Sequence, residues 1–141
     1  MPLDEKYDII TMVDVIEHVI DPRSLIYEAI KRLNPNGILC VVTPRVDSIP
    51  RGILGFKWWH YRIAHVGYFT KKNLINLLTH FDISVVRDFS PSWFFSFENL
   101  IDRMIRYLPF IKFLKFQLVA KYTVRINLHD SIAVIGKKNE P

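Results

Sequence analysis

The chain has 141 residues, half of them hydrophobic and 13% aromatic, a composition that excludes a disordered chain and predicts one folded domain. Its net charge of +5 favours anionic partners, but no nucleic-acid motif is present, so we expect no nucleic-acid partner. The single cysteine, Cys40, excludes an intrachain disulfide and a cysteine-based zinc site.

The most informative stretch, residues 7–22, reads YDIITMVDVIEHVIDP. It opens with a β-branched run that predicts a buried strand and closes with Asp21-Pro22, a pair suited to capping and beginning a helix. Asp14, Glu17 and His18 lie between the strand and the helix. Ligands of open α/β sheets bind at the carboxyl ends of strands, so these residues mark the predicted site.

The next elements follow a strand, helix, strand order. Residues 22–33 have apolar positions at helical spacing, residues 34–37 (NPNG) predict a turn, and residues 38–43 (ILCVVT) predict a strand buried on both faces. Short connections between two strands and a helix predict a parallel crossover.

Residues 44–68 predict a long irregular segment that is rich in proline, glycine and aromatic residues. Loops of this length in a compact domain are commonly lids, and the aromatic residues at 56, 58, 59 and 61 favour a packed one. Thr70 then caps a predicted helix over residues 71–80, and residues 82–89 predict the third strand.

Residues 90–122 break this pattern. Phe94 and five later apolar residues, up to Leu108, form one helical stripe, and FIKFLKF follows at residues 110–116. Two readings stay open: a helical hairpin covering the substrate side of the sheet, or a basic amphipathic element on a membrane surface. No signal peptide and no long apolar run appear, so we expect a cytoplasmic protein, with peripheral membrane contact as an option.

Residues 131–138 (SIAVIGKK) predict the last strand. Residues 124–128 alternate in polarity and could pair with that strand as a hairpin across the turn at His129-Asp130.

These residues, in this order, resemble the C-terminal half of a class I (Rossmann-like) S-adenosylmethionine-dependent methyltransferase. The nearest subgroup is the polyprenyl-dihydroxybenzoate and related small-molecule O-methyltransferases. The matching pieces are YDIITMVDVIEHVIDP, LNPNGILCVVTP, HVGYFT with LINLLTHF, and DSIAVIGKK. The resemblance implies an α/β fold with the last four strands of the family's sheet, mostly parallel with an antiparallel final strand. It also implies one partial domain over residues 1–141, with a helical insertion near residues 93–122.

The chain departs from this family at Arg45, where relatives often have asparagine, and above all in its glycines. Members bind S-adenosylmethionine mainly through a glycine-rich loop after the first strand, whereas the five glycines here, at 37, 52, 55, 67 and 136, form no such loop. The resemblance therefore implies that the first three strands are absent, which leaves one edge of residues 8–14 open. We expect a second copy, a complementing N-terminal chain or rearranged helices to cover that edge.

The resemblance also assigns roles to residues. Met12 and Val13 take the positions of cofactor contacts, and Asp14 or His18 would take the proton of the acceptor hydroxyl. An acceptor pocket is assigned to a larger set, which comprises Glu17, Arg45, Trp58, Trp59, Tyr61 and His65. Each assignment has a plain alternative, a core valine for Val13, a surface arginine for Arg45 and a packed lid for the aromatic residues.

A divalent cation is a further option. In some relatives an equivalent of DxxEH and a later histidine bind such an ion, and Asp14, Glu17, His18 and His65 would be the matching ligands here. Two carboxylates and two imidazoles are chemically competent for this role. The alternative is that Glu17 and His18 only brace the neighbouring loop.

The predicted function is S-adenosylmethionine-dependent methyl transfer to a small hydroxylated acceptor, lipid-like or glycan-related, with a homodimer or a complementing chain completing the domain. The alternative from another class is a non-catalytic half-domain that binds a partner chain or a membrane surface. The missing glycine loop favours the alternative for this chain alone, whereas the retained DxxEH and His65 favour the enzyme.

Overall fold

The computed structural model describes residues 5–108, 110 and 122–140. The chain forms two compact units, one of Met1–Pro91 with His129–Pro141 and one of Ser92–Leu128. Each unit has its own sheet, and each is described separately below.

The first unit contains a four-stranded sheet in the order β1-β2-β6-β3. Its strands are β1 (Tyr7–Val13), β2 (Leu33–Pro44), β3 (Ile83–Phe89) and β6 (Ser131–Lys138). β1 and β2 are parallel, whereas β6 runs antiparallel to both of its neighbours, β2 and β3. This arrangement confirms the predicted α/β class and the antiparallel final strand.

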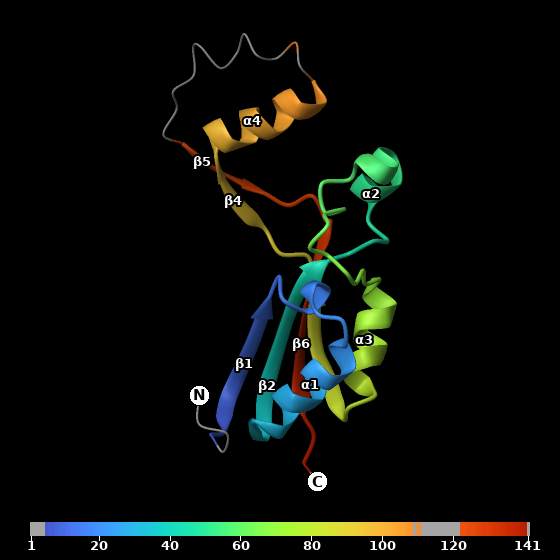
Figure 1. Ribbon diagram of the computed structural model, residues 1–141. Helices are drawn as coiled ribbons and strands as arrows, with labels where there is room; N and C mark the ends of the chain where they lie inside the picture. Colours follow the sequence, from blue (N-terminus) through green and yellow to red (C-terminus); the bar gives the residue numbers. More distant parts are fainter. Residues whose placement is uncertain (1–4, 109, 111–121, 141) are drawn as a thin grey trace. The chain divides into compact units, whose positions relative to one another are not determined.

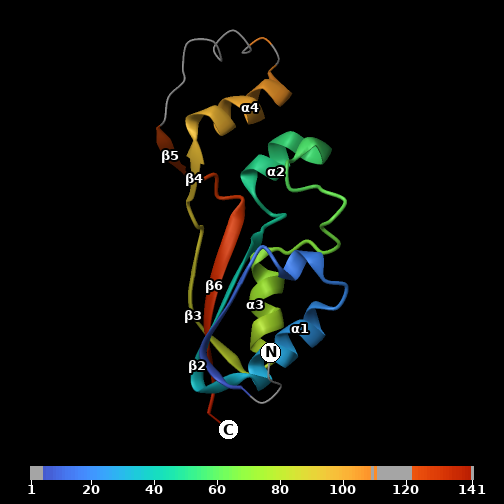
Figure 2. The same ribbon diagram turned by 60° about the vertical axis from the view of Figure 1, so that its left-hand side comes forward.

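Two helices pack on one face of this sheet, α1 (Pro22–Lys31) and α3 (Lys71–Thr79), as Figures 1 and 2 show. Both begin where the sequence predicts, because each has a local cap. The Asp21 carboxylate accepts hydrogen bonds from the backbone N–H groups of Arg23 and Ser24, and the Thr70 hydroxyl accepts one from Asn73. The helices therefore start next to the carboxyl ends of β1 and β2.

The hydrophobic core lies between these helices and the sheet. Its fully buried members include Leu39 and Val41 of β2, Val134 of β6 and Leu74 of α3. On the opposite face of the sheet, Ile9 and Val86 are each more than 60% exposed, whereas Val42 and Ala133 are buried. One face thus holds the core while the other presents apolar side chains to solvent.

The open edge of β1 is confirmed among the described residues, where β1 pairs with β2 alone. An apolar groove of about 450 Å³ runs beside this edge, between β1 and α1. Its lining includes Tyr7, Ile10, Met12, Leu25 and Ala29. The edge therefore combines free backbone groups with apolar surface.

Two stretches of the first unit are more ordered than the sequence predicts. Residues 34–37, expected to form a free turn, lie within β2 as an irregularity, because Tyr7 pairs with Leu33 while Ile9 already pairs with Ile38. The segment 44–68 contains α2 (Ile49–Leu54), capped by Ser48, and the 3-10 helix η2 (Gly55–Lys57).

The second unit pairs β4 (Trp93–Ser96) antiparallel with β5 (Thr123–Ile126) and contains α4 (Phe97–Tyr107). The predicted hairpin between residues 124–128 and the last strand is therefore wrong, because both edges of β6 are already occupied by β2 and β3. Phe94 lies in β4 and not on the helical stripe, since the Ser96 hydroxyl caps the helix after it.

Most of the FIKFLKF stretch, residues 111–116, lies outside the described residues. Among the helices that the structure describes, none has the length and apolar character needed to cross a membrane.

Candidate functional site

The predicted site begins where β1 ends. The Asp14 backbone N–H donates to the Val42 carbonyl of β2 at 3.0 Å, and Asp14 adopts a left-handed conformation with φ of 51°. Aspartate tolerates this conformation better than most residues. The 3-10 helix η1 (Ile16–His18) follows and is fixed by Ile16, which is completely buried. This turn directs Glu17 inward.

Glu17 is a buried carboxylate, with 1% of its surface exposed. The Thr43 hydroxyl donates to its Oε2 at 2.9 Å, whereas Oε1 is buried with no hydrogen-bond partner. Burial raises the pKa of Glu17 and outweighs the hydrogen bonds that favour its charged form. Its backbone carbonyl accepts from Val66 and Gly67, which ties the segment 44–68 to the site.

Two histidines lie beside Glu17. The rings of His18 and His65 meet edge to face, with centroids 4.6 Å apart, and His18 Nδ1 lies 2.8 Å from the Ala64 carbonyl oxygen. That contact requires Nδ1 to carry the proton and leaves Nε2 as a lone-pair donor. His65 Nδ1 is buried without a partner, and burial, followed by the nearby His18 and His60, lowers the pKa of His65.

One ligand atom from each of Glu17, His18 and His65 lies within 4.8 Å of the others, a grouping that could hold a metal ion. Asp14, the fourth predicted ligand, does not join this grouping and is exposed. The unpartnered Glu17 and His65 atoms and the hydrogen bond of His18 to a carbonyl fit the usual surroundings of a metal ligand. The donor set of two imidazoles and one carboxylate suits a first-row divalent ion.

The aromatic segment predicted as a packed lid is packed at Trp58, whereas Phe56 is 97% exposed. Trp58 is 1% exposed, and its ring contacts those of His60 and Tyr61 edge to face. For Trp58, the alternative of a packed lid therefore applies, rather than an acceptor pocket. Tyr61 is half-buried, and its hydroxyl accepts a hydrogen bond from Arg51. Trp59 Nε1 instead donates to the carboxylate of Asp130 at 2.8 Å.

Asp130 is the site residue that sequence reasoning missed, because it stands in what looked like a simple turn before the last strand. It is 5% exposed, and His60 Nε2 lies 2.9 Å from the same carboxylate oxygen that Trp59 contacts. Burial acts to raise the pKa of Asp130, but the hydrogen bonds from His60 and Trp59 prevail and the pKa falls below its ordinary value.

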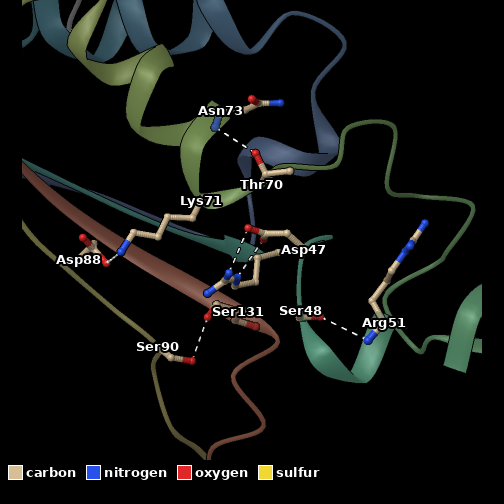
Figure 3. Close-up of polar contacts among 10 residues, drawn as sticks. Asp47, Ser48, Arg51, Thr70, Lys71, Asn73, Asp88, Ser90 and Ser131 are labelled. Atoms are coloured by element: carbon tan, nitrogen blue, oxygen red, sulfur yellow. Dashed lines mark hydrogen bonds and ion pairs between the residues drawn. The ribbon is translucent and has the colours of Figure 1, made fainter. Parts of the chain in front are cut away.

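Arg45 is not free to meet a ligand. Its guanidinium makes two hydrogen bonds to Asp47, at 2.9 and 3.0 Å, so its charge is already paired. Figure 3 shows Asp47 together with the Lys71–Asp88 ion pair and the hydrogen bond from Ser90 to the Ser131 carbonyl. Arg45 could bind an anionic acceptor only by giving up Asp47.

Comparison with known proteins identifies the family of this chain. A family model described as a methyltransferase domain matches residues 2–87, more than half of the chain. The chain belongs to the methyltransferase-domain family. S-adenosylmethionine is the cofactor of this family. A Candida albicans protein named ubiquinone biosynthesis O-methyltransferase, mitochondrial, is 36% identical over 77 residues, which cover 54% of this chain and 24% of that relative.

Solved structures agree on the methyltransferase fold. A Bacillus halodurans structure described as a methyltransferase superposes with a TM-score of 0.61 at 20% identity, covering 99% of this chain and 68% of that one. An S-adenosylmethionine-dependent methyltransferase from Thermotoga maritima gives 0.57 at 20% identity, covering 99% and 60%. The cyclase SpnF gives 0.54 at 14% identity, covering 98% and 52%. A cyclase among these structures shows that the fold alone does not fix the reaction.

Val13 and Met12, the two residues predicted to contact the cofactor, differ in how exposed they are. Val13 is 49% exposed at the end of β1, next to Asp14. Met12 is 6% exposed and belongs to the hydrophobic core, so a cofactor contact from it would come from its backbone. The structure thus brings Glu17, His18 and His65 together, keeps Val13 and Asp14 exposed beside them, and holds Met12 inside.

Proposed function

We propose that the domain to which this chain belongs transfers a methyl group from S-adenosylmethionine to a hydroxyl group of a small acceptor. The observation that carries the proposal is the grouping of the buried Glu17 with His18 and His65 at the carboxyl end of β1, in a chain of the methyltransferase family. A buried carboxylate with an unpartnered oxygen costs stability, so its presence favours a chemical role. Transfer to oxygen is supported by the name of the Candida albicans relative.

The residues present fit one side of a cofactor site. Val13 and Asp14 are exposed where β1 ends, which is where ligands of α/β sheets bind. None of the five glycines forms a phosphate- or sugar-binding loop, and the chain spans 24% of the length of the Candida albicans relative. We therefore propose that further strands, from a companion segment or a second copy, pair with the open edge of β1 and complete the cofactor site.

The test is transfer of a labelled methyl group from S-adenosylmethionine to a phenolic probe such as catechol, by an assembly in which the edge of β1 is filled. Calorimetric titration with S-adenosylhomocysteine, on the chain alone and in that assembly, reports cofactor binding separately. We expect binding and turnover in the assembly, and the combined variant Asp14→Asn with His18→Gln tests whether the bases that the family resemblance implies take part. Full activity of that double variant would remove both residues from the mechanism.

A divalent cation at Glu17, His18 and His65 is a second proposal about the same cluster, and its support is the pair of unpartnered buried atoms. Calorimetric titration of chelator-treated protein with Mg²⁺, Mn²⁺ and Zn²⁺ tests it. We expect His65→Gln, which removes a direct ligand, to weaken the ion's binding by at least the roughly 10- to 100-fold that is typical for loss of an outer-shell partner. His80→Gln is the matched control, because His80 is exposed after the far end of α3. Equal affinities in both variants would refute the metal site.

The alternative reading, a non-catalytic half-domain at a membrane surface, draws its support from the second unit. Phe94, Phe110 and Tyr122 are 69%, 70% and 76% exposed there, in a chain with a net charge of +5. Co-sedimentation with anionic and with neutral phosphatidylcholine vesicles tests this reading. Binding that requires anionic lipid, together with no methyl transfer in a completed assembly, would favour it over the enzyme.

A further inference from the structure

The contact between Asp130 and His60 joins two residues that are 70 positions apart in the sequence. The Asp130 side chain is 6% exposed and that of His60 is 19% exposed, so the hydrogen bond is largely shielded from water. Trp59 Nε1 donates to the same carboxylate oxygen, which holds the carboxylate in place. Neither residue belongs to the cluster of Glu17, His18 and His65.

This geometry fixes the tautomer of the His60 ring. A carboxylate oxygen only accepts, so His60 Nε2 carries the proton and donates it to Asp130. The neutral ring then has its lone pair on Nδ1, and no hydrogen bond to that atom occurs within the described part of the chain. A carboxylate behind an imidazole also stabilises the ring once it becomes protonated, as in catalytic pairs of other enzymes.

His60 lies beside the candidate site. Its ring is stacked near that of His65, with centroids 6.3 Å apart, and His65 in turn contacts His18. Asp130 immediately precedes β6, and its carbonyl accepts from the Arg45 backbone N–H just after β2 ends. The Asp130–His60 pair and the end of β1 are therefore on the same, carboxyl-end side of the sheet.

We propose that His60 is the catalytic base of the methyl transfer and that Asp130 is its positioning residue. The proposal rests on the proposed function. The acceptor oxygen attacks the methyl carbon, the bond from carbon to sulfur breaks, and its electron pair stays on sulfur as the sulfonium becomes a neutral thioether. The proton of the acceptor hydroxyl goes to His60 Nδ1, and the positive charge that leaves the sulfonium appears on the imidazolium next to Asp130.

His60 is better arranged for this role than Asp14 or His18, the bases that the family resemblance implies. Asp14 is exposed, and a hydrated carboxylate is a weak base for a hydroxyl group. His18 Nδ1 donates to an uncharged backbone carbonyl, and the nearby Glu17 carboxylate makes no hydrogen bond to the His18 ring among the described residues. Of His18, His60 and His65, only His60 contacts the Asp130 carboxylate, which supplies the charge that stabilises an imidazolium.

The first test compares kcat of the completed assembly for two phenolic probes, catechol and 4-nitrocatechol. We expect His60→Gln to lower kcat with catechol by about 10²–10⁴-fold while the Kd for S-adenosylhomocysteine stays unchanged. The loss should shrink by about tenfold or more with 4-nitrocatechol, whose hydroxyl is already largely ionised in neutral solution and needs no base. Asp130→Asn should lower kcat in the same pattern but less, and His80→Gln should leave it unchanged.

The second test needs no turnover. Nitrogen-15 NMR of the chain as it stands should show His60 with a protonated Nε2 and a lone-pair Nδ1, and Asp130→Asn should mix the two tautomers. The turnover of the unmodified assembly reports on the proposed function, whereas the ratio of variant to unmodified rates reports on His60. A proton on Nδ1 in the unmodified chain, an unchanged kcat in His60→Gln, or equal losses with both probes would overturn the assignment.

Discussion

Glu17 combines nearly complete burial with a single side-chain hydrogen bond, from Thr43. Because burial raises the pKa of Glu17 above its ordinary value of 4.5, the folded state binds this proton more tightly than the unfolded state. The free energy of unfolding therefore falls as pH rises from about 4.5 through the folded pKa, and the charged side chain costs stability at neutral pH.

We predict that Glu17→Gln stabilises the metal-free protein at neutral pH by on the order of 1 kcal/mol and removes this part of the pH dependence. The glutamine carbonyl keeps the hydrogen bond from Thr43 while the buried charge is lost. Thermal unfolding between acidic and neutral pH in the presence of a chelator measures both effects. Glu28→Gln is the control, because Glu28 is exposed in its pair with Lys31. A Glu17→Gln protein that is less stable at neutral pH would contradict the prediction.

At the scale of elements, β6 packs closely against β3 at Gly136, which has no side chain. A Cβ atom at this position would lie 2.2 Å from Cγ2 of Ile83, which is 1% exposed and fixed in the core. The two strands approach closely here because glycine leaves room for the branched side chain.

We predict that Gly136→Ala destabilises the fold by about 1–3 kcal/mol through overpacking. Adding Ile83→Ala removes the clashing methyl group, so the double variant should lose less than the sum of the two single losses. Gly52→Ala, where an added Cβ would meet nothing within 4 Å, is the matched control. Urea unfolding of the four proteins measures the differences, and strictly additive losses would show that the clash is not the cause.

The open edge of β1 gives a second prediction at this scale. Alternate amides of a strand point to opposite sides, and only one side of β1 has a partner strand. Hydrogen exchange of the isolated chain should therefore show every second amide of residues 7–13 exchanging rapidly, and a companion strand should protect them. Uniform slow exchange in a monodisperse monomer would mean that the edge is already covered.

At the scale of the whole molecule, the second unit, Ser92–Leu128, is inserted between two neighbouring positions of the first. Ser90 donates a hydrogen bond to the Ser131 carbonyl at 3.0 Å, so the chain leaves and re-enters the first unit at adjacent points. An insertion of this kind can be shortened with little cost in loop-closure entropy.

We predict that replacing residues 92–128 by a short glycine-serine linker leaves the first unit folded, with its thermal midpoint within about 5 °C of the full chain. The shortened protein should also lose any binding to anionic vesicles, if the second unit supplies it. Amide NMR spectra and thermal unfolding test the first expectation. Collapse of the dispersed spectrum would show that the second unit is needed for folding.

The sequence by itself determined the four strands of the first unit, the helices α1 and α3, and part of the candidate site. The caps at Asp21 and Thr70 act within three residues of themselves, and apolar periodicity is read within one element, so both can be recognised locally. Glu17 and His18 were found for the same reason, as titratable residues at the end of a strand.

Only the tertiary structure decided which distant residues meet. Asp130 joins His60 across 70 positions, Asp14 stays outside the grouping of Glu17, His18 and His65, and β5 pairs with β4 rather than β6. Such contacts depend on the paths of long connections and on which strand edges are already occupied. No local pattern records these constraints, because they arise only when the sheet has assembled around its core.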